Sequence, residues 1–199
     1  MYYRIFRKLY QRAAEKMCQD CADFIDKGSK ILDLGCGSGI VGSKFQEFFE
    51  AKITGIDIQD RRIEKIPFQI FDGFHLPFPD NSFEIVLISY VLHHAKDPET
   101  LLREAKRVSG GKIIIYEDLP EGFLSKLRCH LHKISYKIFQ KETFGNFKTK
   151  KEWEELFQKT GLKIICEKKV FAPKFAFFDP VYRILFVLEG VWLSGRAHS

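Results

Sequence analysis

The chain has 199 residues, enough for one domain with a full-sized core but too few for two ordinary domains and a linker. Its hydrophobic residues make up 45% and its charged residues 29% of the total, which excludes disordered and fibrous proteins. The apolar stretches are too interrupted for a membrane-spanning helix or a signal peptide. Five cysteines without a regular framework favour a reducing compartment, so we expect a cytoplasmic protein.

The first predicted element is an amphipathic helix that ends at Gly28. Its apolar residues recur at three- and four-residue spacing: Leu9, Ala13, Met17, Cys21 and Phe24. Cys18 and Cys21 spell CxxC within it, but no second cysteine or histidine pair completes a zinc site. We therefore expect no metal.

Strands and helices are then predicted to alternate. Four β-rich runs are too short for independent helices: Lys30–Leu34, Ile53–Ile58, Ser82–Tyr90 and Lys112–Tyr116. Helical spacing appears at Ile40–Phe49, Pro98–Val108 and Trp153–Lys159, and two more strands are predicted at Leu162–Val170 and Ile184–Glu189. This alternation indicates an α/β fold whose mostly parallel sheet is covered on both faces.

A further helix interrupts the alternation inside a basic segment, residues 126–151. Its apolar stripe consists of Phe123, Leu127, Leu131, Ile134 and Ile138. Within a single domain, 1–199, we expect N-terminal helices at 1–28 and a helical lid insertion at 120–152. The stripe fits two interpretations equally, a lid facing the site or a helix packed on the sheet. The basic residues either attract an anionic partner, including a membrane surface, or only keep the surface soluble.

A glycine loop, Gly35–Gly39, joins the first strand to a helix. Glycines there bring backbone amides close to a ligand at the helix N-terminus. Asp57, about 20 residues later at a strand end, suits the two hydroxyls of a ribose. Together they predict an adenosine-containing ligand. Because Gly37–Gly42 also spells GxGxxG, a nicotinamide-dependent oxidoreductase stays open at this point.

Five motifs in order are similar to those of class I S-adenosylmethionine-dependent methyltransferases, specifically the type 11 group: Ile31–Gly39, Gly55–Asp57, Asp72–Phe83, Leu92–His94 and Arg107–Gly111. The similarity covers Ser29 to Tyr116 continuously, and the segment after Asp72 has no role in nicotinamide binding. It implies a Rossmann-like three-layer sandwich with a seven-stranded, mostly parallel sheet. The implied strand order is 3-2-1-4-5-7-6, with strand 7 antiparallel.

The resemblance also implies S-adenosyl-L-methionine as cofactor, S-adenosyl-L-homocysteine as product, and a set of cofactor-binding residues. These are Asp33, Gly35, Cys36, Gly37, Gly39, Asp57, Ile58, Asp72, Gly73, Phe74, Ser89 and Tyr90. In such enzymes Asp33 would help orient the methionine amino group and Asp57 would hold the ribose. Asp72 would contact the adenine amino group, and Tyr90 would line both the cofactor and the acceptor pocket.

Methyl transfer needs positioning and exclusion of water more than acid or base help. The candidate catalytic residues are His94 and Tyr90. Further candidate bases near strand ends are His75, His93 and Glu117. A structural hydrogen bond is the alternative for at least one of the paired histidines.

These features predict a methyltransferase that acts on a small-molecule or lipid-like acceptor. Nucleic acid is not expected, because no added recognition domain or base-stacking motif is evident. The basic segment keeps an RNA methyltransferase open as an alternative. A non-catalytic S-adenosylmethionine-binding module also stays open, since no catalytic side chain is obligatory.

Overall fold

The computed structural model describes residues 2–122, 125–127, 129–130, 147–170 and 182–191. Its helices are α1 (Tyr2–Ile5), α2 (Arg7–Asp20), α3 (Ile40–Phe49), α4 (Pro98–Val108) and α6 (Lys150–Lys159), with 3-10 turns at Ala22–Phe24 and Leu92–His94. Its strands are β1 (Lys30–Leu34), β2 (Lys52–Asp57), β3 (Phe68–Ile70), β4 (Phe83–Ser89), β5 (Ser109–Leu119), β6 (Leu162–Val170) and β7 (Tyr182–Gly190).

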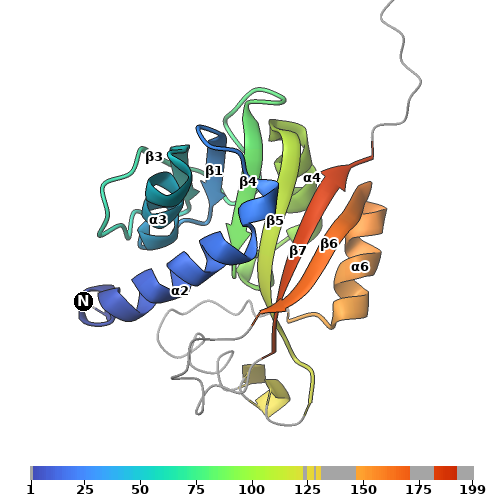
Figure 1. Ribbon diagram of the computed structural model, residues 1–199. Coiled ribbons are helices and arrows are strands. Elements are labelled where there is room, and N and C mark those ends of the chain that lie inside the picture. Colours follow the sequence, from blue (N-terminus) through green and yellow to red (C-terminus); the bar gives the residue numbers. More distant parts are fainter. Residues whose placement is uncertain (1, 123–124, 128, 131–146, 171–181, 192–199) are drawn as a thin grey trace, which may run out of the picture.

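The strands form one sheet in the order β3-β2-β1-β4-β5-β7-β6. Strands β1 to β5 pair in parallel, and β7 runs antiparallel to both of its neighbours. Figure 1 shows the sheet with helices on both faces. The predicted Rossmann-like architecture, strand order and antiparallel seventh strand are therefore confirmed.

Two apolar cores lie on the two faces of the sheet, because successive strand residues point in opposite directions. On one face α2 and α3 pack through Met17, Cys18 and Phe45 against Ile31 and other strand residues. On the other face α4 and α6 cover a second core, whose helical members include Leu101, Leu102, Ala105, Trp153 and Phe157. This two-sided covering fixes the strands whose ends carry the site.

The N-terminal helix ends earlier than predicted, at Asp20 rather than Gly28. Cys21 leaves the helical conformation and a 3-10 turn follows. The Met17 carbonyl accepts hydrogen bonds from the Cys21 amide and from the Tyr116 hydroxyl of β5, at 3.2 and 2.8 Å. This tertiary contact stabilises the end of the helix, and no local sequence pattern predicts it.

Two strands also differ from expectation. The edge strand β3 has only three residues and pairs with β2 alone, so its pattern was too short to predict from periodicity. Strand β5 spans Ser109–Leu119 instead of Lys112–Tyr116, because Ser109 pairs with Phe83 before a shift in register and Glu117 to Leu119 pair with β7.

Most of the predicted lid insertion, 120–152, lies outside the described residues, and so does most of its apolar stripe. The lid and the single-domain division of 1–199 stay predictions. Within the described ranges, no helix is long and apolar enough to cross a membrane.

Candidate functional site

From β1 the chain continues to β2 on one side, and from β4 it continues to β5 on the other side. The strand order therefore reverses between β1 and β4. In open α/β sheets, ligands bind outside the carboxyl ends of the strands at such a switch point. The predicted glycine loop follows β1 at this position, and Asp57, Ser89 and Glu117 lie at or near the ends of β2, β4 and β5. The fold thus gathers the predicted residues at one edge of the sheet.

The glycine loop is fastened to the end of β2. The amides of Gly35 and Cys36 donate to the Ile56 carbonyl, and the Gly37 amide donates to Asp57 Oδ2 at 2.8 Å. Gly35 has a φ of +76°, and a Cβ there would overlap the Val91 side chain. Gly37 has a φ of +50°, and the nearest atoms to an added Cβ would be 4.0 Å away. The loop is therefore packed tightly behind Gly35 and more loosely around Gly37.

The ends of β2 and β3 form a second part of the site. An added Cβ on Gly73 would lie 3.3 Å from the Ile58 side chain, which is 45% exposed. Asp72 Oδ1 accepts from the amides of Phe74 and His75, both at 2.7 Å, and Oδ2 contacts His75 Nδ1 at 3.1 Å. These hydrogen bonds lower the pKa of Asp72 to about 2, so the carboxylate is ionised at neutral pH.

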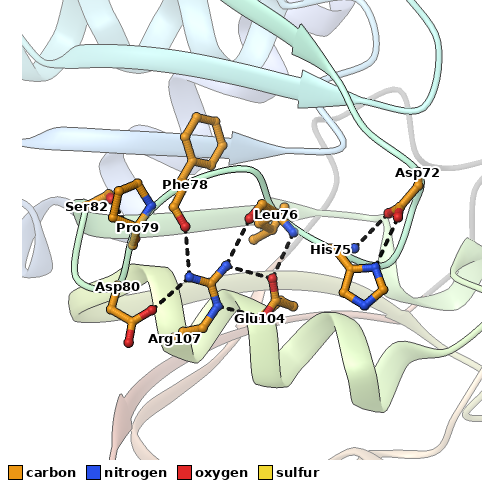
Figure 2. A network of polar contacts seen from close by, with 9 residues as sticks. All are labelled: Asp72, His75, Leu76, Phe78, Pro79, Asp80, Ser82, Glu104 and Arg107. Carbon is orange, nitrogen blue, oxygen red and sulfur yellow. Dashed lines mark hydrogen bonds and ion pairs between the residues drawn. The ribbon is translucent and has the colours of Figure 1, made fainter.

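Arg107 of α4 holds the loop that follows Asp72 (Figure 2). Its guanidinium donates to the carbonyls of Leu76 and Phe78, at 2.9 and 2.8 Å, and to Asp80 at 2.8 Å. It also makes two hydrogen bonds to Glu104, whose Oε2 accepts from the Leu76 amide. A rigid, planar guanidinium suits such a convergence of acceptors, and it ties the loop to α4.

Two polar side chains at the ends of β1 and β4 are buried without a hydrogen-bond partner for one atom, Asp33 Oδ2 and Ser89 Oγ. Asp33 is only 1% exposed. Burial raises the pKa of Asp33 to about 7, the Gly42 amide opposes this, and the Asp57 charge adds to it. Buried polar atoms are normally satisfied, so these two indicate a place for a polar ligand.

Residues 3–167 match the protein family described as methyltransferase domain, which is most of the chain. The chain belongs to the methyltransferase family. The protein MJ1123 of Methanocaldococcus jannaschii is 36% identical over 151 residues, covering 71% of this chain and 67% of that protein. The class I S-adenosylmethionine-dependent assignment is confirmed, whereas the type 11 subgroup stays a prediction.

Other relatives match this chain over a smaller share of their own length. The 27-O-demethylrifamycin SV methyltransferase of Amycolatopsis mediterranei is 30% identical over 103 residues, covering 44% of this chain but only 38% of that enzyme. A solved complex of the Haloferax volcanii Trm112 methyltransferase activator with a methyltransferase contains a similar chain. The TM-score is 0.71 with 17% identity, over 92% of each chain. At that identity the likeness shows the fold alone.

S-adenosylmethionine, the cofactor of this family, fits the residues present. The looser packing at Gly37 is compatible with a ligand along the loop, and the unsatisfied Asp33 and Ser89 atoms lie at neighbouring strand ends. Asp57 uses Oδ2 for the Gly37 amide, and a carboxylate can accept further bonds. Together these residues could hold the methionine and ribose parts, with Asp72, Gly73 and Phe74 near Ile58 for the adenine.

Tyr90 lies beyond β4 in the left-handed region, with a φ of +59°. Its amide donates to the Tyr116 carbonyl at 2.8 Å. Strained backbone of this kind gathers at functional sites of many proteins. Burial raises the pKa of Tyr90, so the phenol stays protonated at neutral pH and could donate a hydrogen bond but not remove a proton.

The two histidines after β4 have different surroundings in this methyltransferase. His94 is half-buried, and its ring centroid lies 4.0 Å from that of His93. His93 is 2% exposed, stacks on Phe147, and approaches Glu117 Oε2 through Nδ1 at 2.5 Å. The other Glu117 oxygen accepts from the Leu92 amide at 2.8 Å. Glu117 thus fixes both the histidine and the turn that carries it.

The sequence predicts that the N-terminal helix, residues 3–10, closes one edge of the site, but it does not predict the individual contacts. The N-terminal helix brings the Tyr3 hydroxyl within 4.0 Å of the Cβ position of Gly37. Arg7 of α2 pairs with Glu64 through two hydrogen bonds, at 2.7 and 3.0 Å. Arg107 belongs to a predicted motif, yet its five hydrogen bonds were not foreseen. Among the described residues, no cluster of three or more acidic, cysteine or histidine side chains could hold a metal ion.

Proposed function

We propose that this chain transfers a methyl group from S-adenosylmethionine to a small-molecule or lipid-like acceptor. The observation that carries the proposal is the convergence of the glycine loop, Asp57 and the unsatisfied Asp33 oxygen at one switch point of the sheet. When bound, the cofactor supplies an already activated methyl group. The residues of the chain then need chiefly to orient the two reactants and exclude water.

The arrangement supports the following cofactor contacts. Asp33 and Ser89 would hold the methionine part together with the loop amides, and Asp57 would accept from the ribose. Asp72 would contact the adenine amino group, with Gly73 and Phe74 beside the ring. Tyr90, His94 and the His93–Glu117 pair lie on the side where the methyl acceptor would bind. A general base there would assist methylation of substrates that lose a proton in the reaction.

A small-molecule acceptor is supported by the relative that methylates a rifamycin, 27-O-demethylrifamycin SV methyltransferase. Radiolabelled S-adenosylmethionine should be incubated with the protein and separate small-molecule, lipid and RNA extracts. We expect protein-dependent label in the small-molecule or lipid fraction. Label confined to RNA would support the alternative acceptor class, and no label in any fraction would support a non-catalytic module.

Replacing Arg107 by methionine is expected to weaken binding of S-adenosylhomocysteine roughly tenfold, because the loop after Asp72 loses its anchor on α4. Discrimination between this ligand and its inosine analogue should fall as well, since the adenine amino group is read from that loop. Arg107 is partly exposed, so the free energy of unfolding should drop by only about 1–2 kcal/mol.

The matched control for this test is Arg103→Met, on the exposed face of the same helix. Arg103 bonds Glu99 and the Lys159 carbonyl, away from the loop. Calorimetry on both variants separates a loop effect from a helix effect. Equal ligand affinity in Arg107→Met and wild type would exclude the positioning role.

A further inference from the structure

One face of the N-terminal helices carries an exposed strip that mixes cationic and apolar side chains. We call it the N-terminal strip, and it consists of Arg4, Ile5, Lys8, Leu9 and Arg12, all exposed. Lys8, Leu9 and Arg12 share one side of α2 by their three- and four-residue spacings, and Arg4 and Ile5 end α1 directly before it. The opposite side buries Ala14, Met17 and Cys18 against the body of the protein.

The strip is unusual for a helix on a water-soluble surface. Ile5 is 67% and Leu9 40% exposed, although the outward face of a surface helix is mostly polar. Residues 2–14 hold four basic residues and no acidic one. Cations along one edge and branched apolar side chains along the other are the pattern of a helix that lies in a membrane interface.

We propose that the N-terminal strip docks on an anionic lipid bilayer. The cations would lie among the phosphate groups while Ile5 and Leu9 enter the boundary of the acyl chains. A second copy of the chain would bring like charges together at this face. Single-stranded nucleic acid is bound by cations together with aromatic side chains that stack on bases. The apolar edge of the strip, Ile5 and Leu9, is aliphatic, and the neighbouring Phe6 is the one aromatic side chain of residues 4–9.

The strip lies close to the proposed cofactor site. Arg7, on the same helix, is joined to Glu64 in the segment after β2, and Tyr3 approaches Gly37 of the glycine loop. Docking would therefore place the glycine loop near the bilayer surface and favour an acceptor dissolved in or attached to the lipid. This consequence for the acceptor rests on the proposed function, whereas membrane docking itself does not.

Vesicle flotation of the full chain tests the docking. The vesicles are phosphatidylcholine alone or with about 30% phosphatidylglycerol, in about 0.1 M salt, where screening is moderate. Wild type is expected to bind the anionic vesicles at least about tenfold better than the neutral ones. Lys8→Glu/Arg12→Glu and Ile5→Ser/Leu9→Ser should each lose at least about tenfold of this binding.

Matched controls carry equal changes elsewhere on the surface. Lys52→Glu/Lys163→Glu makes the same change in charge, and Phe48→Ser/Ile165→Ser removes two exposed apolar groups. Both should bind anionic vesicles within about twofold of wild type. Titration with S-adenosylhomocysteine should be the same in all the variants, so loss of docking is distinguishable from failure of the cofactor site.

Two results would overturn the proposal. One is absence of wild-type binding to the anionic vesicles, including the case in which the protein binds single-stranded RNA instead. The other is equal vesicle binding by wild type and both strip variants, which would place the contact on another surface.

Discussion

Replacing Glu117 by alanine is expected to lower the free energy of unfolding by about 3–5 kcal/mol, because two buried donors lose their acceptor and a cavity is left. Glu117 is fully buried, and its two oxygens hold the His93 ring and the Leu92 amide. Alanine would leave both donors buried without their acceptors. Urea denaturation measures the loss, and Glu189→Ala, an exposed acid of β7, should change stability by less than about 0.5 kcal/mol.

The milder variant Glu117→Gln keeps a hydrogen-bond acceptor but removes the charge. Burial alone would lower the pKa of His93, but the charge and hydrogen bond of Glu117 raise it overall. Because the folded pKa is raised, this contribution to stability is fully present below the unfolded pKa of about 6.5 and is lost as pH rises through the folded pKa. The stability gap between wild type and Glu117→Gln should therefore be wider at about pH 6 than at about pH 9. A gap that is independent of pH would mean that His93 does not ionise against Glu117.

Affinity for S-adenosylhomocysteine is expected to rise about tenfold from about pH 6 to about pH 8 through ionisation of Asp33. Burial raises the pKa of Asp33 to about 7, and only its carboxylate attracts the positively charged amino group of the ligand. Asp33→Asn should bind more weakly and lose this pH dependence. Calorimetry at both pH values tests it, with exposed Asp23→Asn as a control that keeps the wild-type profile.

Ionisation of the same carboxyl group is expected to lower the stability of the ligand-free protein. Its folded pKa lies above the unfolded value, so the folded state binds more protons and stability falls as pH rises from about 4 to about 7. The total cost is about 4 kcal/mol, which Asp33→Asn should remove. If Asp33→Asn is less stable than wild type at about pH 8, the carboxylate must have a stabilising partner in the folded protein.

Local patterns predicted that the glycine loop and Asp57 lie together at the ends of neighbouring strands, whereas the other proposed cofactor residues came from the family resemblance. The glycine loop lies between a β-rich run and a helical stripe, and Asp57 follows at a spacing typical of one strand–helix–strand unit. Both signals depend only on residues close together in the sequence. In the structure, the Gly37 amide donates a hydrogen bond to Asp57. The roles of the individual residues in binding stay predictions.

The acceptor side depends on contacts between distant segments. His93 and Glu117 are 24 positions apart and meet because β4 pairs with β5 in a register that places Ser89 beside Tyr116. Arg107 reaches Leu76 across 31 positions. The hydrophobic periodicity of the sequence does not show which residues of two strands lie side by side, or which oxygens a guanidinium contacts. The His93–Glu117 and Arg107–Leu76 pairs therefore could not be predicted from one sequence.

Calorimetric titration with S-adenosylhomocysteine tests most directly whether the switch point holds the cofactor. The wild type should bind one ligand per chain. Asp57→Ala, which loses the ribose acceptor and the partner of the Gly37 amide, should bind roughly 10- to 100-fold more weakly. Asp26→Ala, an exposed acid before β1, should bind like wild type. No binding by the wild type, or unchanged affinity in Asp57→Ala, would contradict the proposed cofactor site.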